Sequence, residues 1–179
     1  MAYRGNDYNE ILQEWIFRPL EMNETYWSNT IYGPNSPVYY TSDGEEYLPV
    51  IEIDYTGPGG EKTTLRDLHK FMLAVGTDTL LSKASWELAF KPHSLPEEAL
   101  RYKWGTHKYP YGYGFNLAEL PYTNGETDAT VSHGGAGTGT SSYTLRFLEK
   151  DRVVVLWNNK FLDPMPLELY EALAELSSK

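Results

Sequence analysis

The hydrophobic period of this 179-residue chain changes at about residue 110, and this change constrains the fold more than any other feature. Before it, apolar residues recur at the three- and four-residue spacing of helices. After it, they lie in short strand-like runs separated by glycine, asparagine or charged turns. Helices followed by strands indicate an α+β fold. We therefore expect a single domain, with helices and long loops in residues 1–110 and antiparallel strands plus a C-terminal helix in residues 111–179.

Capping residues and apolar faces predict the helices of the first half. Residues 7–17 are predicted to form one helix, since their apolar residues recur at helical spacing. A second helix is predicted to begin after Thr64, which forms a capping-box pattern with Asp67. A serine cap predicts a third helix over residues 82–90, and residues 95–102 add another turn or two.

Residues 28–58 are rich in tyrosine, glycine, proline, asparagine and serine, which predicts a long ordered loop region. A brief alternating stretch lies at residues 47–53. The aromatic residues from Tyr26 to Tyr55, together with Trp104, Tyr109 and Tyr111, leave two interpretations open. They could line a substrate cleft, or they could cover a sparse core, because amphipathic rings suit half-buried surfaces.

The second half is predicted to build an antiparallel sheet followed by a helix. Asp163 and the proline after it form a helix start, and leucines at helical spacing give that helix an apolar face. Asn124-Gly125 is a hairpin signal, so we interpret the Tyr122-Thr123-Asn124 triplet as a turn. The expected strands are residues 113–120, 129–132, 141–148 and 152–158.

Composition excludes several classes of function. A formal net charge of −10 without a basic stripe disfavours nucleic acid as a partner. The chain has no cysteine, so disulfides and thiolate chemistry are excluded. The longest apolar run, near residues 153–157, is far below the ~20 residues that cross a bilayer. The histidines lack metal-site spacing, and we expect neither a metal nor a cofactor.

Three segments, in their order along the chain, each contain one short motif. Residues 16–25 read Ile-Phe-Arg-Pro-Leu-Glu-Met-Asn-Glu-Thr and include the predicted end of the first helix. Residues 59–71 combine a Gly-Gly turn with Thr-Thr-Leu-Arg-Asp-Leu at the start of a helix. Residues 111–115 read Tyr-Gly-Tyr-Gly-Phe.

The fourth segment contains the candidate site residues. His133, Gly134 and Gly135 precede Ala136, and a Val-rich strand ending in Trp157 follows. Small residues let a substrate backbone approach a strand, and a donor or cation at the first position stabilises developing negative charge. An imidazole with an ordinary pKa of ~6.5 serves either role, depending on its neighbours.

Together, these four segments resemble the serine β-lactamase-like family, which includes class C β-lactamases, D,D-peptidases and related esterases. The resemblance implies the C-terminal part of the β-lactamase/transpeptidase-like fold. It implies that the side chain of His133 and the backbone N–H of Ala136 stabilise the acyl oxygen. It further places Gly134, Gly135, Tyr111 and Tyr113 at the substrate. A periplasmic or extracytoplasmic location is plausible by the same resemblance, although residues 1–7 show no signal peptide.

The family's acylating serine is expected in a Ser-x-x-Lys motif, because lysine one helical turn later can take the hydroxyl proton. No serine of this chain is followed by lysine at the third position, and no Tyr-x-Asn triplet precedes Pro19. We therefore expect the N-terminal strands and the nucleophile helix to be missing. The isolated chain is expected not to turn over an ester or β-lactam at an enzyme-like rate.

Two functions remain open for this chain. In the first, the chain is part of a serine hydrolase whose parent enzyme acts on peptide, ester, amide or β-lactam acyl groups. The second is a non-catalytic module that binds a peptide, glycan or protein on the same scaffold. A truncated half would expose sheet edges, so a second copy or a partner chain could complete the sheet.

Overall fold

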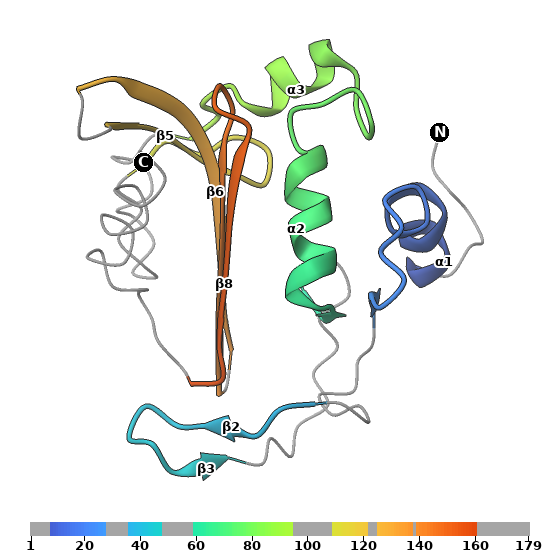
Figure 1. Ribbon diagram of the computed structural model, residues 1–179, viewed down its shortest axis with the longest axis vertical. Coiled ribbons are helices and arrows are strands. Elements are labelled where there is room, and N and C mark those ends of the chain that lie inside the picture. The colour runs from blue at the N-terminus through green and yellow to red at the C-terminus, as the bar shows by residue number, and fades with distance from the viewer. Residues whose placement is uncertain are drawn as a thin grey trace.

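The computed structural model describes residues 8–27, 36–47, 59–94, 109–121, 125–137 and 139–160. Within these residues, a four-stranded antiparallel sheet packs against helices, as Figure 1 shows. This arrangement confirms the α+β class. The turns predicted at residues 95–102 and 122–124 and the helix predicted after Asp163 lie outside the described residues.

The sheet has the strand order β5-β6-β7-β8, with each strand antiparallel to the next. The strand predicted at residues 129–132 is longer in the structure, because it continues through the glycine-rich segment in register with β7. The strand predicted from Tyr113 begins later, because Gly114 has a φ of 81° and forms a turn. The bounds are β5 (Asn116–Pro121), β6 (Thr127–Gly137), β7 (Thr140–Phe147) and β8 (Arg152–Asn158).

The three helices predicted from caps are present. The hydroxyl of Thr64 accepts a hydrogen bond from the N–H of Asp67 at 3.2 Å, and Ser82 caps the third helix through the N–H of Ser85. The first helix begins as an α-helix and continues as a π-helical turn. The bounds are α1 (Tyr8–Leu12), η1 (Gln13–Phe17), α2 (Leu65–Ala74) and α3 (Lys83–Ala89).

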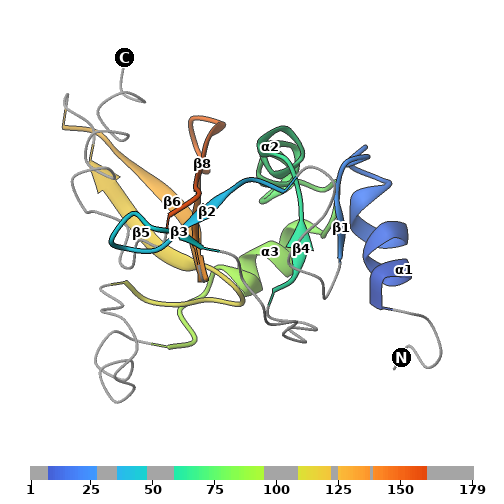
Figure 2. The same ribbon diagram turned by 90° about the horizontal axis from the view of Figure 1, so that it is seen from below.

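Short strands lie on both sides of the segment predicted as a long loop, residues 28–58, and within it. β1 (Tyr26–Trp27) pairs with β4 (Glu61–Lys62), which brings the chain back to the start of α2, as Figure 2 shows. β2 (Tyr39–Tyr40) and β3 (Glu46–Tyr47) form a small hairpin. The N–H of Tyr40 donates to the C=O of Asn159 at 2.9 Å, so this hairpin is attached to the end of β8.

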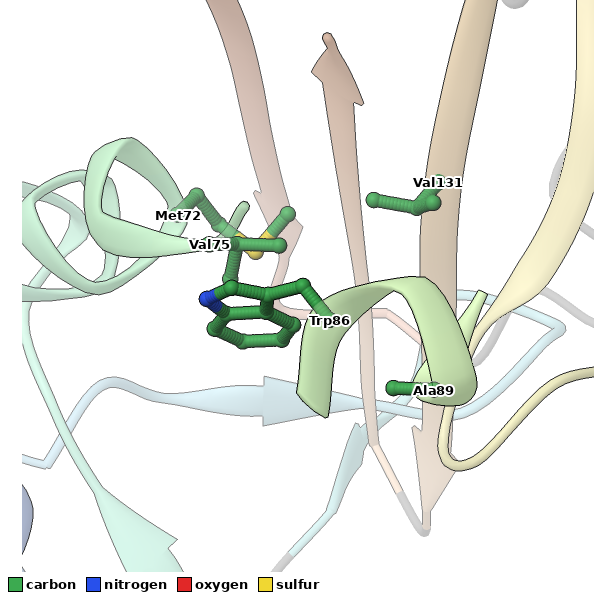
Figure 3. Packing of buried hydrophobic residues seen from close by; sticks show 5 residues of the cluster. All are labelled: Met72, Val75, Trp86, Ala89 and Val131. Carbon is green, nitrogen blue, oxygen red and sulfur yellow. The ribbon is translucent and has the colours of Figure 1, made fainter. Parts of the chain in front are cut away.

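The main core lies between the helices and one face of the sheet. Figures 1 and 2 show α2 between the sheet and α1. Burying each large apolar side chain stabilises the fold by about 1.5–3 kcal/mol. Figure 3 shows the cluster of buried residues from α2, the residue directly after it, α3 and β6, which consists of Met72, Val75, Trp86, Ala89 and Val131.

The other face of the sheet has its own apolar cluster. Tyr143, Leu145 and Phe147 are buried there, and Val154 and Leu156 of β8 pack against them. Because side chains alternate along a strand, the intervening residues of β7 face α2. The buried guanidinium of Arg146 accordingly donates from Nε to the C=O of Val75 at 3.3 Å.

A buried carboxylate joins the start of α2 to the turn after η1. Asp67 is 1% exposed, and its Oδ2 accepts hydrogen bonds from the N–H of Glu24 at 2.8 Å and the hydroxyl of Thr25 at 3.0 Å. The Nζ of Lys70 donates to Oδ1 at 2.9 Å and also to the C=O of Glu21. Glu21 has a φ of 54°, so it keeps the left-handed conformation that usually favours glycine. Lys70 and Asp67 therefore brace the strained turn.

Candidate active site

The candidate site lies where β6 extends beyond the first residue of β5. That residue is Asn116, which lies opposite Ser132 of β6. β6 continues to Gly137, paired with β7 alone among the described strands. Alternate residues of an antiparallel strand direct their N–H and C=O groups toward opposite sides. The edge from His133 onward can thus align an extended acyl group, as in β-strand addition.

His133 is exposed at the start of this edge. Its Nε2 lies 3.0 Å from the hydroxyl of Tyr111, and the two ring centroids are 6.2 Å apart at an interplanar angle of 61°. Strand alternation places His133 two residues from Val131, on the same face as α2. The structure therefore brings together two of the predicted site residues that are 22 positions apart in the sequence.

Burial raises the pKa of Tyr111 above the ordinary tyrosine value of about 10. Its phenol is consequently protonated at neutral pH and can donate to an unprotonated imidazole nitrogen. The backbone of Tyr111 forms bridges with Ser94 and Asn116. The phenol is thus presented from a segment that is hydrogen-bonded to two other parts of the chain.

The two glycines after His133 differ in how much space a side chain would have at each position. A Cβ at Gly135 would lie 2.9 Å from the hydroxyl oxygen of Ser142, which itself donates to the C=O of Gly135 at 3.5 Å. A Cβ at Gly134 would lie 3.5 Å from the ring of Tyr143, an ordinary contact. Gly135 therefore keeps β6 close to β7, whereas Gly134 leaves the strand surface open. Ala136 is exposed and pairs with the buried Ser141.

Tyr113 is oriented differently from the other predicted site residues. Its ring is 58% exposed and stacks on His93, with centroids 3.9 Å apart and an interplanar angle of 4°. Nε2 of His93 lies 3.0 Å from the C=O of Leu88, at the end of α3. The two tyrosines of the Tyr-Gly-Tyr segment thus contact different histidines, and only Tyr111 contacts His133.

A cavity of about 590 Å³ lies between the start of α2, the β2 segment and the ends of β7 and β8. Tyr26 and Tyr39 line it, which agrees with the interpretation that the aromatic residues of this region line a cleft. Burial lowers the pKa of Lys62 in its wall, and the charge of Glu61 partly opposes this effect. The other lining residues include the aromatic Trp157 and the hydroxyl-bearing Ser36, Thr63, Thr64, Thr140 and Ser142.

Among the residues that the structure describes, no group of three or more His, Cys, Asp or Glu side chains could hold a metal ion. Nor is any helix in this part of the chain both long and apolar enough to span a bilayer.

The structure is an α+β domain in which a glycine-rich strand edge extends beyond its neighbour, and comparisons with known proteins identify the family. The sequence model of the family described as Beta-lactamase matches residues 2–177. The chain therefore belongs to the β-lactamase family.

Individual relatives agree with this assignment. The chain is 29% identical over 172 residues to penicillin-binding protein 4* of Bacillus subtilis (strain 168), covering 87% of this chain and 36% of that protein. It is similar in fold to a D-stereospecific amidohydrolase from Streptomyces (TM-score 0.71, 19% identity, 94% of this chain and 48% of the other). It is also similar to the octameric penicillin-binding protein homologue from Pyrococcus abyssi (TM-score 0.68, 20% identity, 94% and 38%). The chain thus spans about a third to a half of the length of these relatives.

Proposed function

We propose that this chain forms the acyl-binding half of a serine hydrolase that acts on peptide, ester, amide or β-lactam acyl groups. The observation that carries the proposal is the edge of β6 beyond Ser132, where β7 is the sole strand neighbour among the described elements. His133 and the small residues after it lie along that edge. A scissile acyl group aligned there meets backbone donors and an imidazole at the same time.

The chemistry assigned to this edge is stabilisation of the oxygen on which negative charge develops. The N–H of Ala136 acts as one donor to that oxygen, and the ring of His133 supplies a second polar contact. Donors that are fixed before the reaction are worth about 2.7–4 kcal/mol each in comparable sites. Glycine at positions 134 and 135 lets the acyl chain approach the strand without a side chain in the way.

The nucleophile is not supplied by this chain in the proposed mechanism. None of its serines has a lysine at the third following position, so no hydroxyl has the amine base that the family chemistry uses. We propose that a serine-bearing segment outside these 179 residues completes the site. The isolated chain then binds acyl ligands without turning them over.

Intact-mass spectrometry tests the missing-nucleophile part of the proposal. The folded chain is incubated with a fluorescent penicillin and, separately, with a serine-reactive phosphonate. We expect no stoichiometric adduct with either reagent. An adduct mapped to one serine would show that the chain is a complete enzyme with a different catalytic arrangement.

Amide NMR tests the acyl-binding edge directly. Titration with an N-acylated dipeptide should shift the amide signals of Gly134 and Ala136. Gly135→Val should abolish these shifts, because the added side chain meets the hydroxyl of Ser142 and projects over the strand. Gly125→Ala is the matched control, since a Cβ there meets nothing within 4 Å. Unchanged shifts in Gly135→Val would place the ligand elsewhere.

The aromatic cavity favours a second candidate function, a non-catalytic module that binds a glycan. Its volume lies within the ~300–1,000 Å³ typical of ligand sites, and its walls combine aromatic rings with hydroxyl groups. The indole N–H of Trp157 donates to the hydroxyl of Thr140 at 2.8 Å, so its NMR signal reports on the cavity. Titration with N-acetylglucosamine oligomers should move that signal if this function is correct and leave it unchanged if it is not.

A further inference from the structure

The hydrogen bond between His133 and Tyr111 connects the candidate acyl-binding edge to a segment outside the sheet. The atoms joined are Nε2 of the imidazole and the phenolic oxygen, 3.0 Å apart. The rings are inclined at 61°, so the contact is made through the polar ends of the side chains rather than by stacking. Tyr111 therefore contacts the predicted acyl-stabilising residue.

The backbone of Tyr111 is held at both its N–H and its C=O. Its N–H donates to the C=O of Ser94 at 2.8 Å, and its C=O accepts from the N–H groups of His93 at 2.9 Å and Ser94 at 3.1 Å. The next residue, Gly112, approaches α3 so closely that a Cβ would lie 2.2 Å from the C=O of Ala89. The phenol is thus mounted on a fixed segment, which suits a residue that orients a neighbour.

The protonation states of Tyr111 and His133 determine which of the two side chains donates the hydrogen bond. The phenol carries its proton at neutral pH, because burial makes its ionisation harder. A phenol that donates to Nε2 requires an unprotonated nitrogen there, and a neutral imidazole then carries its single proton on Nδ1. A hydrogen bond to one ring nitrogen fixes which nitrogen bears the proton.

We propose that Tyr111 is a positioning residue that holds His133 in the Nδ1–H tautomer and fixes the orientation of its ring at the edge of β6. This role rests on the proposed function, because the Nδ1–H tautomer gives His133 one defined N–H donor beside the acyl oxygen. Tyr111 acts through His133 and makes no contact with the substrate in this role. This differs from the substrate-binding role that the resemblance implies for the same residue.

Nitrogen-15 NMR of the histidine rings tests the proposal in the intact chain. In the wild type at neutral pH, His133 should carry its ring proton on Nδ1. In Tyr111→Phe, the tautomer ratio should move toward Nε2–H by about 2- to 10-fold, the change that a typical net hydrogen bond supports. Tyr113→Phe is the matched control, because it removes a phenol from the same segment whose ring stacks on His93.

Each result decides the proposal. A wild-type ring protonated on Nε2 refutes it without any variant, so the test survives a Tyr111→Phe protein that fails to fold. A ratio in Tyr111→Phe equal to that of Tyr113→Phe also refutes it. The proposed function is judged separately, because the dipeptide titration reads Gly134 and Ala136 amides. A shifted tautomer without dipeptide binding supports the positioning geometry and rejects the acyl-binding role.

Discussion

Replacing Asp67 with asparagine tests the polar network that joins α2 to the turn after η1. The carboxylate oxygens accept from Lys70 on one side and from Glu24 and Thr25 on the other. An asparagine has one acceptor oxygen, so its NH₂ group must face a donor on one of these sides. Hydrogen bonds to a buried charged group contribute about 1.5–3 kcal/mol each.

The expected loss is smaller than the sum of these bonds. The side chain of Lys70 is 33% exposed, so it can turn to water when its partner is lost. The oxygen of asparagine can keep the contacts with the N–H of Glu24 and the hydroxyl of Thr25, but both lose the charge of the carboxylate, and this loss accounts for most of the cost. We expect Asp67→Asn to lower the free energy of unfolding by about 3 kcal/mol at pH 7.

Urea unfolding at 25 °C measures this loss. With an m-value of about 2 kcal/mol/M, the midpoint should fall by about 1.5 M. Asp78→Asn is the control, because Asp78 is exposed and lies just beyond the end of α2. If the two variants lose equal stability, the buried network does not stabilise the fold as argued.

The pH dependence of the same difference gives an independent check. Burial alone would raise the pKa of Asp67, but the hydrogen bonds from Lys70, Glu24 and Thr25 outweigh burial and lower it. A carboxyl whose folded-state pKa is lowered stabilises the protein fully above its unfolded value of about 3.9. That stabilisation is lost as the pH falls through the folded-state pKa. The gap between wild type and Asp67→Asn should therefore be constant above about pH 5 and shrink below about pH 4.

Four further substitutions test packing and a buried charge, with urea unfolding as the measurement in each case. Gly112→Ala should cost more than about 2 kcal/mol, because the Cβ would lie 2.2 Å from the C=O of Ala89. Gly125→Ala should cost only about 1 kcal/mol, since its φ of 84° strains the backbone without a clash; equal losses would contradict the packing argument. Val131→Ala should cost about 1.5–3 kcal/mol, and a loss below 0.5 would mean that the core collapses around the gap. Arg146→Met should change stability by less than about 1 kcal/mol, because the buried guanidinium leaves Nη1 without a partner among the described residues; a loss above about 3 kcal/mol would show that the ion pair between Arg146 and Asp151 stabilises the fold.

Local signals in the sequence predicted the helices and most of the sheet. Thr64 and Asp67 lie three residues apart, and the capping contact that they form depends on little beyond that spacing. The α+β order follows from the change of hydrophobic period, which each element expresses over its own length. The short strands β1 and β4 were missed, because these two-residue strands exist only through distant pairing, of Tyr26 with Lys62 and of Trp27 with Glu61.

The pairing of His133 with Tyr111 also depends on the assembled fold. His133 was identified from its glycine-rich context, and Tyr111 from the Tyr-Gly-Tyr-Gly-Phe motif, but nothing local links the two. Their contact requires β5 to begin at Asn116, so that the preceding segment can turn toward the edge of β6. Tyr113, only two residues away, stacks on His93 instead. The motif therefore predicted both tyrosines as site residues and did not indicate that only Tyr111 contacts His133.

The sequence predicted a strand that ends at Ser132, and it did not predict that the strand continues through the candidate site residues. Gly134 and Gly135 carry no strand signal, because glycine lacks a side chain to pack and is depleted in strands. In the structure, β6 nonetheless runs through them to Gly137, held by its register with β7. A Cβ at Gly135 would press on Ser142, and side chains along the outer edge would block an acyl chain. The absence of side chains thus removes the local signal for a strand and, at the same residues, provides the open edge on which the proposed acyl binding depends.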